Sequence, residues 1–307
     1  MGIFNNFSKK ETPLLGLLGL DGGIAKAHGG GAGPYSVEIK LWGGGGSASN
    51  RSSPVGNRGG GGGAYVKATF TAAPGTVLYS YVGKSVPHSS PASDYAHANS
   101  GGKGGPGPGD VGGPGGGHSM VLVGNPHPRA KGPTPVDGDI IAVAAGGGTP
   151  SAGGAAGPRG GSPGGFLYGG DGMASGGGPG SPAQGGGGGG SGWYGGGGAS
   201  YHECCWAESS GGGGGSSYGR PTHPGIESPI TFVSSGGSNA SSGDAPAGGE
   251  PDPQWDSTAK YGRGRGDNAG APGYAGRIII NYGPPANVNE NTVSYGYSSG
   301  DHALTLP

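Results

Sequence analysis

The sequence predicts an all-β protein of the β-sandwich or jelly-roll type, with no substantial α-helix. Glycine accounts for 84 of the 307 residues and proline for 28, a composition that disfavours helices of ordinary length. The few β-branched and aromatic residues are concentrated in short alternating runs, which is the pattern of strands with one buried face. The first and last of these runs lie far apart in the sequence, and a sandwich or jelly roll requires such long-range closure.

The strongest predicted strand spans residues 35–42, where apolar residues occupy the odd positions and polar residues the even positions up to 40. Strands at 65–70 and 77–82 flank an Ala-Pro-Gly-Thr turn, and we expect them to pair as a hairpin. Three consecutive isoleucines need burial, so we expect the strand that contains them, at 277–282, to pair within the same β-domain as residues 35–42. Further strands are expected at 120–123, 139–145 and 230–233.

Runs of glycine adjoin most of these strands, for example at 43–46, 59–63 and 146–148. Gly/Pro-rich composition of this kind normally indicates disorder. We nevertheless expect the tracts to be ordered, because the formal net charge is only −1 and the apolar residues are concentrated in strands. An extended helix with three residues per turn and no Cβ atoms can lie close to neighbouring helices of the same kind. Its backbone groups can then form hydrogen bonds with neighbours in several directions, which would replace the missing apolar core.

Several classes of function are disfavoured by the composition. The balance of 17 basic and 18 acidic residues, with no dense basic stripe, gives no reason to expect nucleic acid. No run approaches the roughly 20 apolar residues of a membrane span. The best metal-ligand candidates lack the second cysteine pair that would complete a four-ligand zinc site; they are His202, Glu203, Cys204 and Cys205. We expect no catalytic residues, no cofactor and no metal, and therefore no enzyme.

Five segments, in order, resemble a recurrent glycine-rich domain: SVEIKLWGGGG, GGGGGAYVKATFTAAPGTVLYSYVG, DIIAVAAGGG, WYGGGGAS with GGGGGSSY, and GRIIINYG. That domain is found in phage tail fibre and adhesin proteins, and a related form occurs in the ectodomains of anaplastic-lymphoma-kinase-type receptors. The resemblance covers roughly residues 33–283. It implies a small jelly-roll-like β-sandwich with a bundle of polyglycine II helices inserted between its strands.

The chain accordingly divides into an attachment leader at 1–28, a glycine-rich β-domain at 29–283 and a polar C-terminal tail at 284–307. The candidate attachment residues are the large apolar side chains of the leader: Ile3, Phe4, Phe7, Leu14 and Leu15. The candidate surface-binding residues are aromatic and lie in or beside the inserts between glycine tracts: Trp193, Tyr194, Tyr201, Trp206, Trp255 and Tyr261. Aromatic rings on loops give a large contact area at low entropic cost. The same rings would equally serve to close the ends of the glycine bundle, and both roles stay open.

The resemblance implies a structural protein on the surface of a bacteriophage virion. The expected partners are other virion structural proteins through the leader, a glycan or outer-membrane protein of the host through the loops, and further copies of the chain in a homo-oligomer. Two functions remain open. One is a tail fibre or tip adhesin that binds the host cell, and the other is an architectural protein that decorates head, neck or tail without contacting the host.

Overall fold

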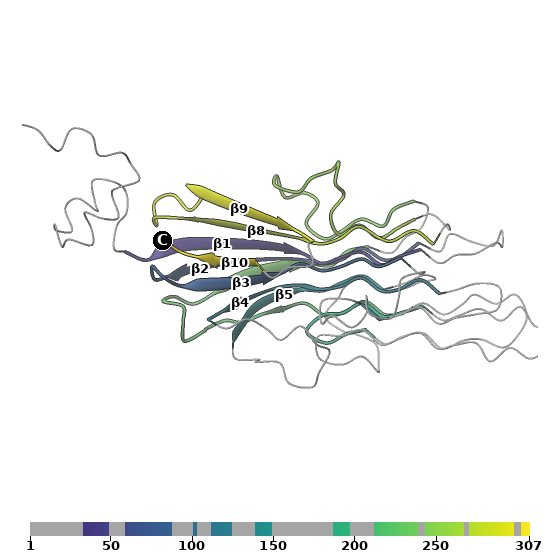
Figure 1. The fold of residues 1–307 in the computed structure, drawn as a ribbon, viewed down its shortest axis with the longest axis horizontal. Helices are drawn as coiled ribbons and strands as arrows, with labels where there is room; N and C mark the ends of the chain where they lie inside the picture. Colours follow the sequence, from purple (N-terminus) through teal and green to yellow (C-terminus); the bar gives the residue numbers. More distant parts are fainter. Residues whose placement is uncertain are drawn as a thin grey trace, which may run out of the picture.

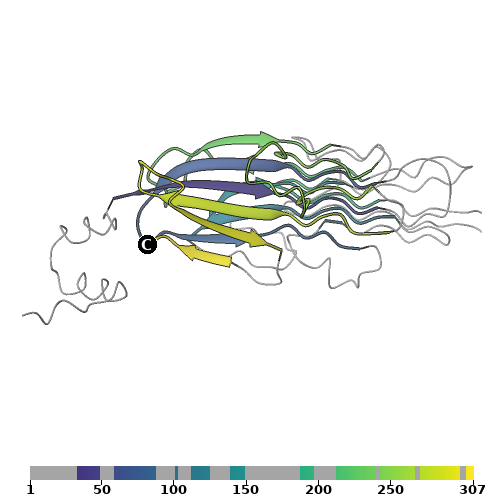
Figure 2. The same ribbon diagram turned by 90° about the horizontal axis from the view of Figure 1, so that it is seen from above.

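The computed structural model describes residues 33–48, 59–87, 101–102, 112–124, 139–148, 187–196, 212–238, 243–266, 270–297 and 302–307. These residues form two five-stranded antiparallel sheets that face each other, and extended glycine-rich segments continue from one end of the sandwich (Figures 1 and 2). The described part of the chain contains no α-helix. The predicted all-β sandwich is confirmed.

We name the two sheets A and B. Sheet A contains β1 (Tyr35–Trp42), β2 (Tyr65–Ala72), β7 (Thr231–Ser235), β8 (Arg277–Gly283) and β9 (Asn291–Gly296). Sheet B contains β3 (Val77–Tyr81), β4 (Ser119–Val123), β5 (Ile140–Ala144), β6 (Tyr218–Gly219) and β10 (His302–Thr305). The strand order is β7-β2-β1-β8-β9 in sheet A and β10-β3-β4-β5-β6 in sheet B.

The core lies between the two sheets and is built from their alternating apolar faces. In β1 the odd positions point inward, as the sequence pattern predicts, and β8 pairs antiparallel with β1 so that Ile39 lies opposite Ile280. The expectation that these two sequence-distant strands belong to one β-domain is therefore confirmed, and the structure shows that they pair directly. The large buried residues of this core are Val37, Ile39, Leu41, Val66, Phe70, Leu78, Val82, Val121, Val123, Ile141, Ile226, Ile230, Ile278, Ile280 and Leu306.

The expected hairpin between β2 and β3 is wrong. β2 lies between β1 and β7 in sheet A, whereas β3 pairs with β4 and β10 in sheet B. The turn at 73–76 instead carries the chain from one sheet to the other, and Gly75 adopts a φ of 82° there, a conformation that favours glycine. A turn of this kind fixes the reversal of the chain but not whether the strands lie side by side or face to face.

The expected polar tail from residue 284 is also wrong, because this segment completes both sheets. β9 pairs with β8 at the edge of sheet A, and β10 pairs with β3 at the edge of sheet B. Leu306 is buried in the core, and the rings of Tyr295 and His302 stack 4.4 Å apart. Edge strands have a neighbour on one side only, so their composition stays polar and gives a weak sequence signal. The leader at 1–28 lies outside the described residues.

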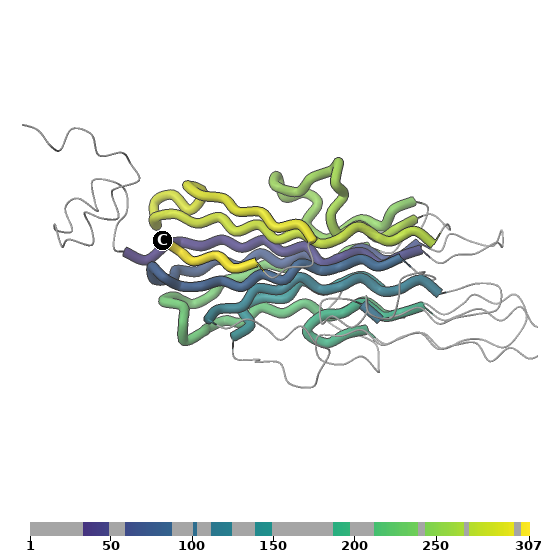
Figure 3. The backbone as a smooth tube through the Cα atoms, viewed as in Figure 1, coloured from purple at the N-terminus to yellow at the C-terminus, as the bar shows by residue number. Residues whose placement is uncertain are grey.

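The glycine tract that follows β1 runs beside other extended segments (Figure 3). Its backbone forms hydrogen bonds with a period of three residues. Successive N–H groups of residues 43–48 donate to segments 59–64, 112–117 and 271–276 in turn, and the cycle then repeats. A period of three is that of a polyglycine or polyproline II helix, which has no internal hydrogen bonds. The accepting carbonyls, at 2.7–3.1 Å, belong to Ala64, Gly117, Tyr274, Gly61, Pro114 and Ala271.

The neighbouring tract follows the same rule. Along residues 60–64 the N–H groups donate in turn to segments 262–265, 145–148 and 236–238 before the cycle repeats. The backbone thus forms a laterally bonded bundle that extends the sandwich, and the expected order of these tracts is confirmed for the described residues. The unusual backbone hydrogen bonding takes over the cohesive role that apolar side chains play in the sandwich.

Glycine is required in the bundle for close approach rather than for conformational freedom. The tract glycines at 43–46 and 60–63 do not have a positive φ. A Cβ atom at Gly45, Gly60 or Gly147 would instead overlap a backbone carbonyl group of an adjacent segment. A small residue other than glycine also occurs in the bundle. Ser47 is buried there, and its hydroxyl group donates to the carbonyl oxygen of Val86 at 2.6 Å.

Candidate functional site

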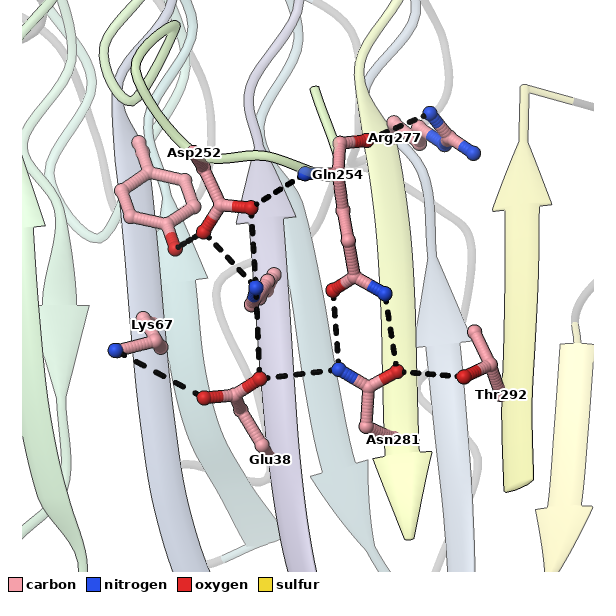
Figure 4. Close-up of polar contacts among 9 residues, drawn as sticks. Glu38, Lys67, Asp252, Gln254, Arg277, Asn281 and Thr292 are labelled. Atoms are coloured by element: carbon pink, nitrogen blue, oxygen red, sulfur yellow. Dashed lines mark hydrogen bonds and ion pairs between the residues drawn. The ribbon is translucent and has the colours of Figure 1, made fainter. Parts of the chain in front are cut away.

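A buried polar network lies on the outer face of sheet A (Figure 4). Lys40 in β1 places its Nζ atom 3.0 Å from both carboxylate oxygens of Asp252 and 3.5 Å from Oε1 of Glu38. The hydroxyl group of Tyr65 in β2 donates to Oδ2 of Asp252 at 2.8 Å. The backbone N–H of Gln254 donates to Oδ1 of Asp252 at 2.9 Å. Both carboxylate oxygens therefore accept from several donors.

An amide ladder continues this network toward β9. Asn281 in β8 donates through Nδ2 to Glu38 and to the side-chain oxygen of Gln254, each at 3.0 Å. The side-chain amide of Gln254 donates back to Asn281 at 3.3 Å, and Thr292 donates to the same oxygen at 2.9 Å. Lys67 lies 3.8 Å from the second oxygen of Glu38. Figure 4 shows these side chains converging from β2, β1, β8 and β9 and from the loop above them.

That loop is residues 248–262, which we call the covering segment. Its Trp255 packs against a buried cluster of Trp42, Tyr65 and Ile279 on the outer face of sheet A. The indole N–H of Trp255 donates to the carbonyl oxygen of Tyr261 at 3.0 Å. The outer face of sheet A is therefore an interior surface here, which explains why three consecutive isoleucines in β8 are all buried.

Ion pairs tie the covering segment and its flanks to the glycine bundle. Arg263 binds Glu250 through two hydrogen bonds of 2.8 and 2.7 Å, a bidentate geometry. Asp244 accepts from Lys260 at 3.0 Å and from the Tyr274 hydroxyl group at 3.1 Å. Burial would raise the pKa of Asp244, but these hydrogen bonds and the backbone N–H of Gly266 hold it below its ordinary value.

The charges of the network follow from its hydrogen bonds. Burial alone would raise the pKa of Asp252, yet the hydrogen bonds from the Gln254 backbone, Lys40 and Tyr65 together lower it below the ordinary value. Burial, followed by the hydrogen bond to Asp252 and its negative charge, raises the pKa of Tyr65 far above its usual range. The tyrosine is therefore a neutral hydrogen-bond donor and the aspartate an anion at neutral pH.

These lowered pKa values predict that the domain loses stability in acid. Above the ordinary aspartate pKa both the folded and the unfolded chain are ionised, and the stabilisation is fully present. As the pH falls below about 4, the unfolded chain binds protons first, so the free energy of unfolding decreases. Urea unfolding of the freshly folded chain at pH 6, 4 and 3 should show this decrease. The slope should be shallower in Asp252→Asn, and an unchanged slope would contradict the assignment to Asp252.

The candidate surface-binding aromatics occupy different environments. Trp255 is partly buried beneath the guanidinium group of Arg263, and Tyr261 lies under that of Arg277, with guanidinium-to-ring distances of 5.2 and 4.8 Å. Trp193 stacks on Tyr218 at 3.8 Å against the outer face of sheet B. Tyr194 is the exposed one, at 59%. The other candidates, Tyr201 and Trp206, and the attachment residues Ile3, Phe4, Phe7, Leu14 and Leu15 lie outside the described residues.

At the end of the bundle that is away from the sandwich, the ends of several described tracts lie next to one another. The N–H of Ala48 donates to Ala271, and the N–H of Gly188 donates to Gly113. A Cβ atom at Gly113 would contact the carbonyl group of Ala48, and one at Gly212 would contact Gly188. Gly33, in contrast, precedes β1 at the opposite end of the sandwich. The start of β1 and the ends of the described tracts therefore lie at opposite ends of the domain.

No helix in the described ranges is long and apolar enough to cross a membrane. Within the same ranges no group of three or more His, Cys, Asp or Glu side chains is arranged to hold a metal ion. The segment with His202, Glu203, Cys204 and Cys205 lies outside them. A comparison with protein-family models gives no match, and a search of curated proteins gives none either.

The polar network was not predicted from the sequence. Glu38 and Lys40 were assigned to the outer face of their strand, which is correct, but nothing local indicated that another segment covers that face. The available signal was the sequence Glu250-Pro-Asp252-Pro-Gln254-Trp255, in which a large aromatic residue and several hydrogen-bonding groups are held by two prolines. Proline fixes the backbone of such a stretch, and a buried Trp ring needs a partner for its indole N–H, so these residues are suited to a loop that packs on the domain.

Proposed function

We propose that this chain is a surface-exposed structural protein of a bacteriophage virion, acting as a tail fibre or tip adhesin. The leader attaches it to other virion proteins, and segments at the far end of the glycine bundle contact the host cell surface. The ligand class is a surface glycan or an outer-membrane protein. The chemistry of this contact is binding alone, with no bond made or broken in the ligand.

One observation supports this proposal: the start of β1 and the ends of the described glycine tracts lie at opposite ends of the domain. Gly33 lies at the sandwich end, and Ala48, Gly113, Gly188 and Gly212 lie together at the other end. The sequences that join the tracts vary in length and composition, and the stretch 197–211 contains two of the candidate aromatics. A bundle held by its own backbone provides a rigid platform on which such joining sequences can differ without loss of the fold.

Mutations in the leader and in the stretch 197–211 should affect incorporation into particles and adsorption to host cells independently. We expect deletion of residues 2–20 to leave the domain folded while abolishing its incorporation into particles, measured by immunoblot of purified virions. We expect the double variant Tyr201→Ala and Trp206→Ala to be incorporated normally but to adsorb to host cells at least about tenfold more slowly, because aromatic contacts dominate binding energy. Phe232→Ala, an aromatic substitution on the exposed strand β7, is the matched control and should adsorb like the wild type.

Normal adsorption of the double aromatic variant would overturn the adhesin function and favour the architectural role without host contact. Incorporation of the deletion variant would show that the leader is not the anchor. Trp255 and Tyr261 are unsuitable for this test, because both are packed against other parts of the domain. Their substitution would alter stability and binding together.

A further inference from the structure

We propose that the side chains of Lys40 and Asp252 condense to an intramolecular isopeptide bond, with the Glu38 carboxylate as proton relay. This modification site is independent of the proposed function, because the bond forms within the isolated chain. It would join β1 covalently to the covering segment, between residues 212 positions apart in the sequence.

The three side chains are already placed for this reaction. Lys40 Nζ is 3.0 Å from each oxygen of Asp252 and 3.5 Å from Glu38 Oε1, so the amine, the carboxyl group and the relay carboxylate are in direct contact. The lysine and the glutamate are fixed by the central strand of sheet A. The aspartate is fixed by the covering segment, whose Trp255 is anchored on the same sheet. Two independently held elements therefore present the reacting groups to each other.

Burial favours the amide over the ion pair. The side chains of Lys40, Asp252 and Glu38 are only 8%, 11% and 17% exposed. Holding charges out of water carries a desolvation penalty, and condensation removes two of these charges at once. The product amide is neutral, and the water it releases leaves a site that solvent reaches poorly. In dilute aqueous solution, hydrolysis of the amide is normally favoured over its formation. This preference is reduced where little water reaches the site.

Donors on both oxygens of Asp252 would stabilise the charge that develops during the addition. The Tyr65 hydroxyl group is 2.8 Å from Oδ2, and the Gln254 backbone N–H is 2.9 Å from Oδ1. Fixed donors of this kind stabilise a tetrahedral intermediate. Asn281 holds Glu38 from the other side at 3.0 Å, so the relay group is also oriented.

The step balances without any external reagent. One proton moves from the Lys40 ammonium group to the Asp252 carboxylate, giving an amine and a carboxylic acid. The amine lone pair then forms the N–C bond at Cγ of Asp252. Glu38 takes the second proton from nitrogen and delivers it to the departing hydroxyl group, and the C–O bond breaks as water leaves. The ion pair is the resting state, so we expect slow maturation after folding.

The test is the mass of the purified full-length chain under denaturing conditions. After incubation at neutral pH the chain should weigh about 18 Da less than its sequence, the mass of one water molecule. Trypsin should fail to cut after Lys40, and fragmentation should locate a cross-link between Lys40 and Asp252. A full sequence mass after prolonged incubation, with both residues recovered in ordinary peptides, would overturn the proposal.

Substitutions distinguish the isopeptide bond from other reactions that also release one water molecule. Lys40→Arg and Glu38→Gln should keep the full mass, whereas Lys67→Arg removes the other lysine beside Glu38 and should keep the deficit. A cross-link that persists in Glu38→Gln would overturn the relay role. Succinimide formation at an Asp-Gly sequence such as Asp171-Gly172 also releases water, so a deficit mapped there would count against the proposal.

Discussion

Replacement of Gly45 by alanine should prevent the glycine bundle from forming and remove much of the stability of the domain. A Cβ atom at this position would lie less than 3.0 Å from the carbonyl group of Arg263 and the amide nitrogen of Gly264. Both are backbone atoms, which cannot rotate aside as the end of a flexible side chain can. The tract would have to shift as a whole, and the hydrogen bond from Gly45 to Tyr274 would be lost with its neighbours.

The expected loss is large for a single methyl group. Overpacking a tight interior costs about 1–3 kcal/mol, and each hydrogen bond that is broken adds about 1 kcal/mol. We therefore expect the free energy of unfolding to fall by roughly 4 kcal/mol, measured by urea unfolding. Gly296→Ala is the matched control, because a Cβ there meets nothing within 4 Å. Equal stability of the two variants would show that the bundle is not closely packed.

The strands were predictable wherever alternation and burial coincide. Residues 35–42 and 277–282 were located from the sequence because their apolar residues are large and their flanks are glycines. That the glycine tracts are ordered rather than disordered could also be inferred. Glycine has no Cβ atom, so neighbouring tracts can come close enough for lateral hydrogen bonds between their backbones. The pairing of individual tracts was not inferable, because one run of glycines is chemically identical to the next.

The errors have a common origin in contacts between distant parts of the chain. The turn at 73–76 has the same local sequence whether it joins paired strands or crosses between sheets. β9 and β10 are edge strands, so their pairing depends on β8 and β3 being in place first. Neither outcome is encoded in the segment itself.

The candidate site was missed for the same reason. The alternation in β1 places Glu38 and Lys40 together on one face, but their ionic partner Asp252 comes from the covering segment. Aromatic residues near Asp252 were interpreted as surface-binding groups because they lie in a long polar insert. In Trp255 the structure shows the alternative role of an aromatic residue in a loop, which is to fasten the loop to a sheet.

Replacement of Ile280 by aspartate should abolish folding, and this is the largest effect we expect from a substitution in the sandwich. Ile280 is fully buried between the sheets, opposite Ile39 of β1 and Val293 of β9. It belongs to the cluster of buried hydrophobic residues between the two sheets. An aspartate there would be a buried charge without a partner, a change that costs several kcal/mol or more.

The neighbouring position shows why the choice of residue matters. Ile279 lies opposite Lys40 on the other face of the sheet, where a new carboxylate would find a cation. Ile280→Asp has no such rescue, so we expect insoluble chain or complete digestion by protease within minutes. Ile280→Val should cost only about 1 kcal/mol. Val233→Asp, at a position 61% exposed in β7, should leave protease resistance unchanged. A soluble, protease-resistant Ile280→Asp variant would mean that β8 is peripheral, against the pairing of β8 with both β1 and β9.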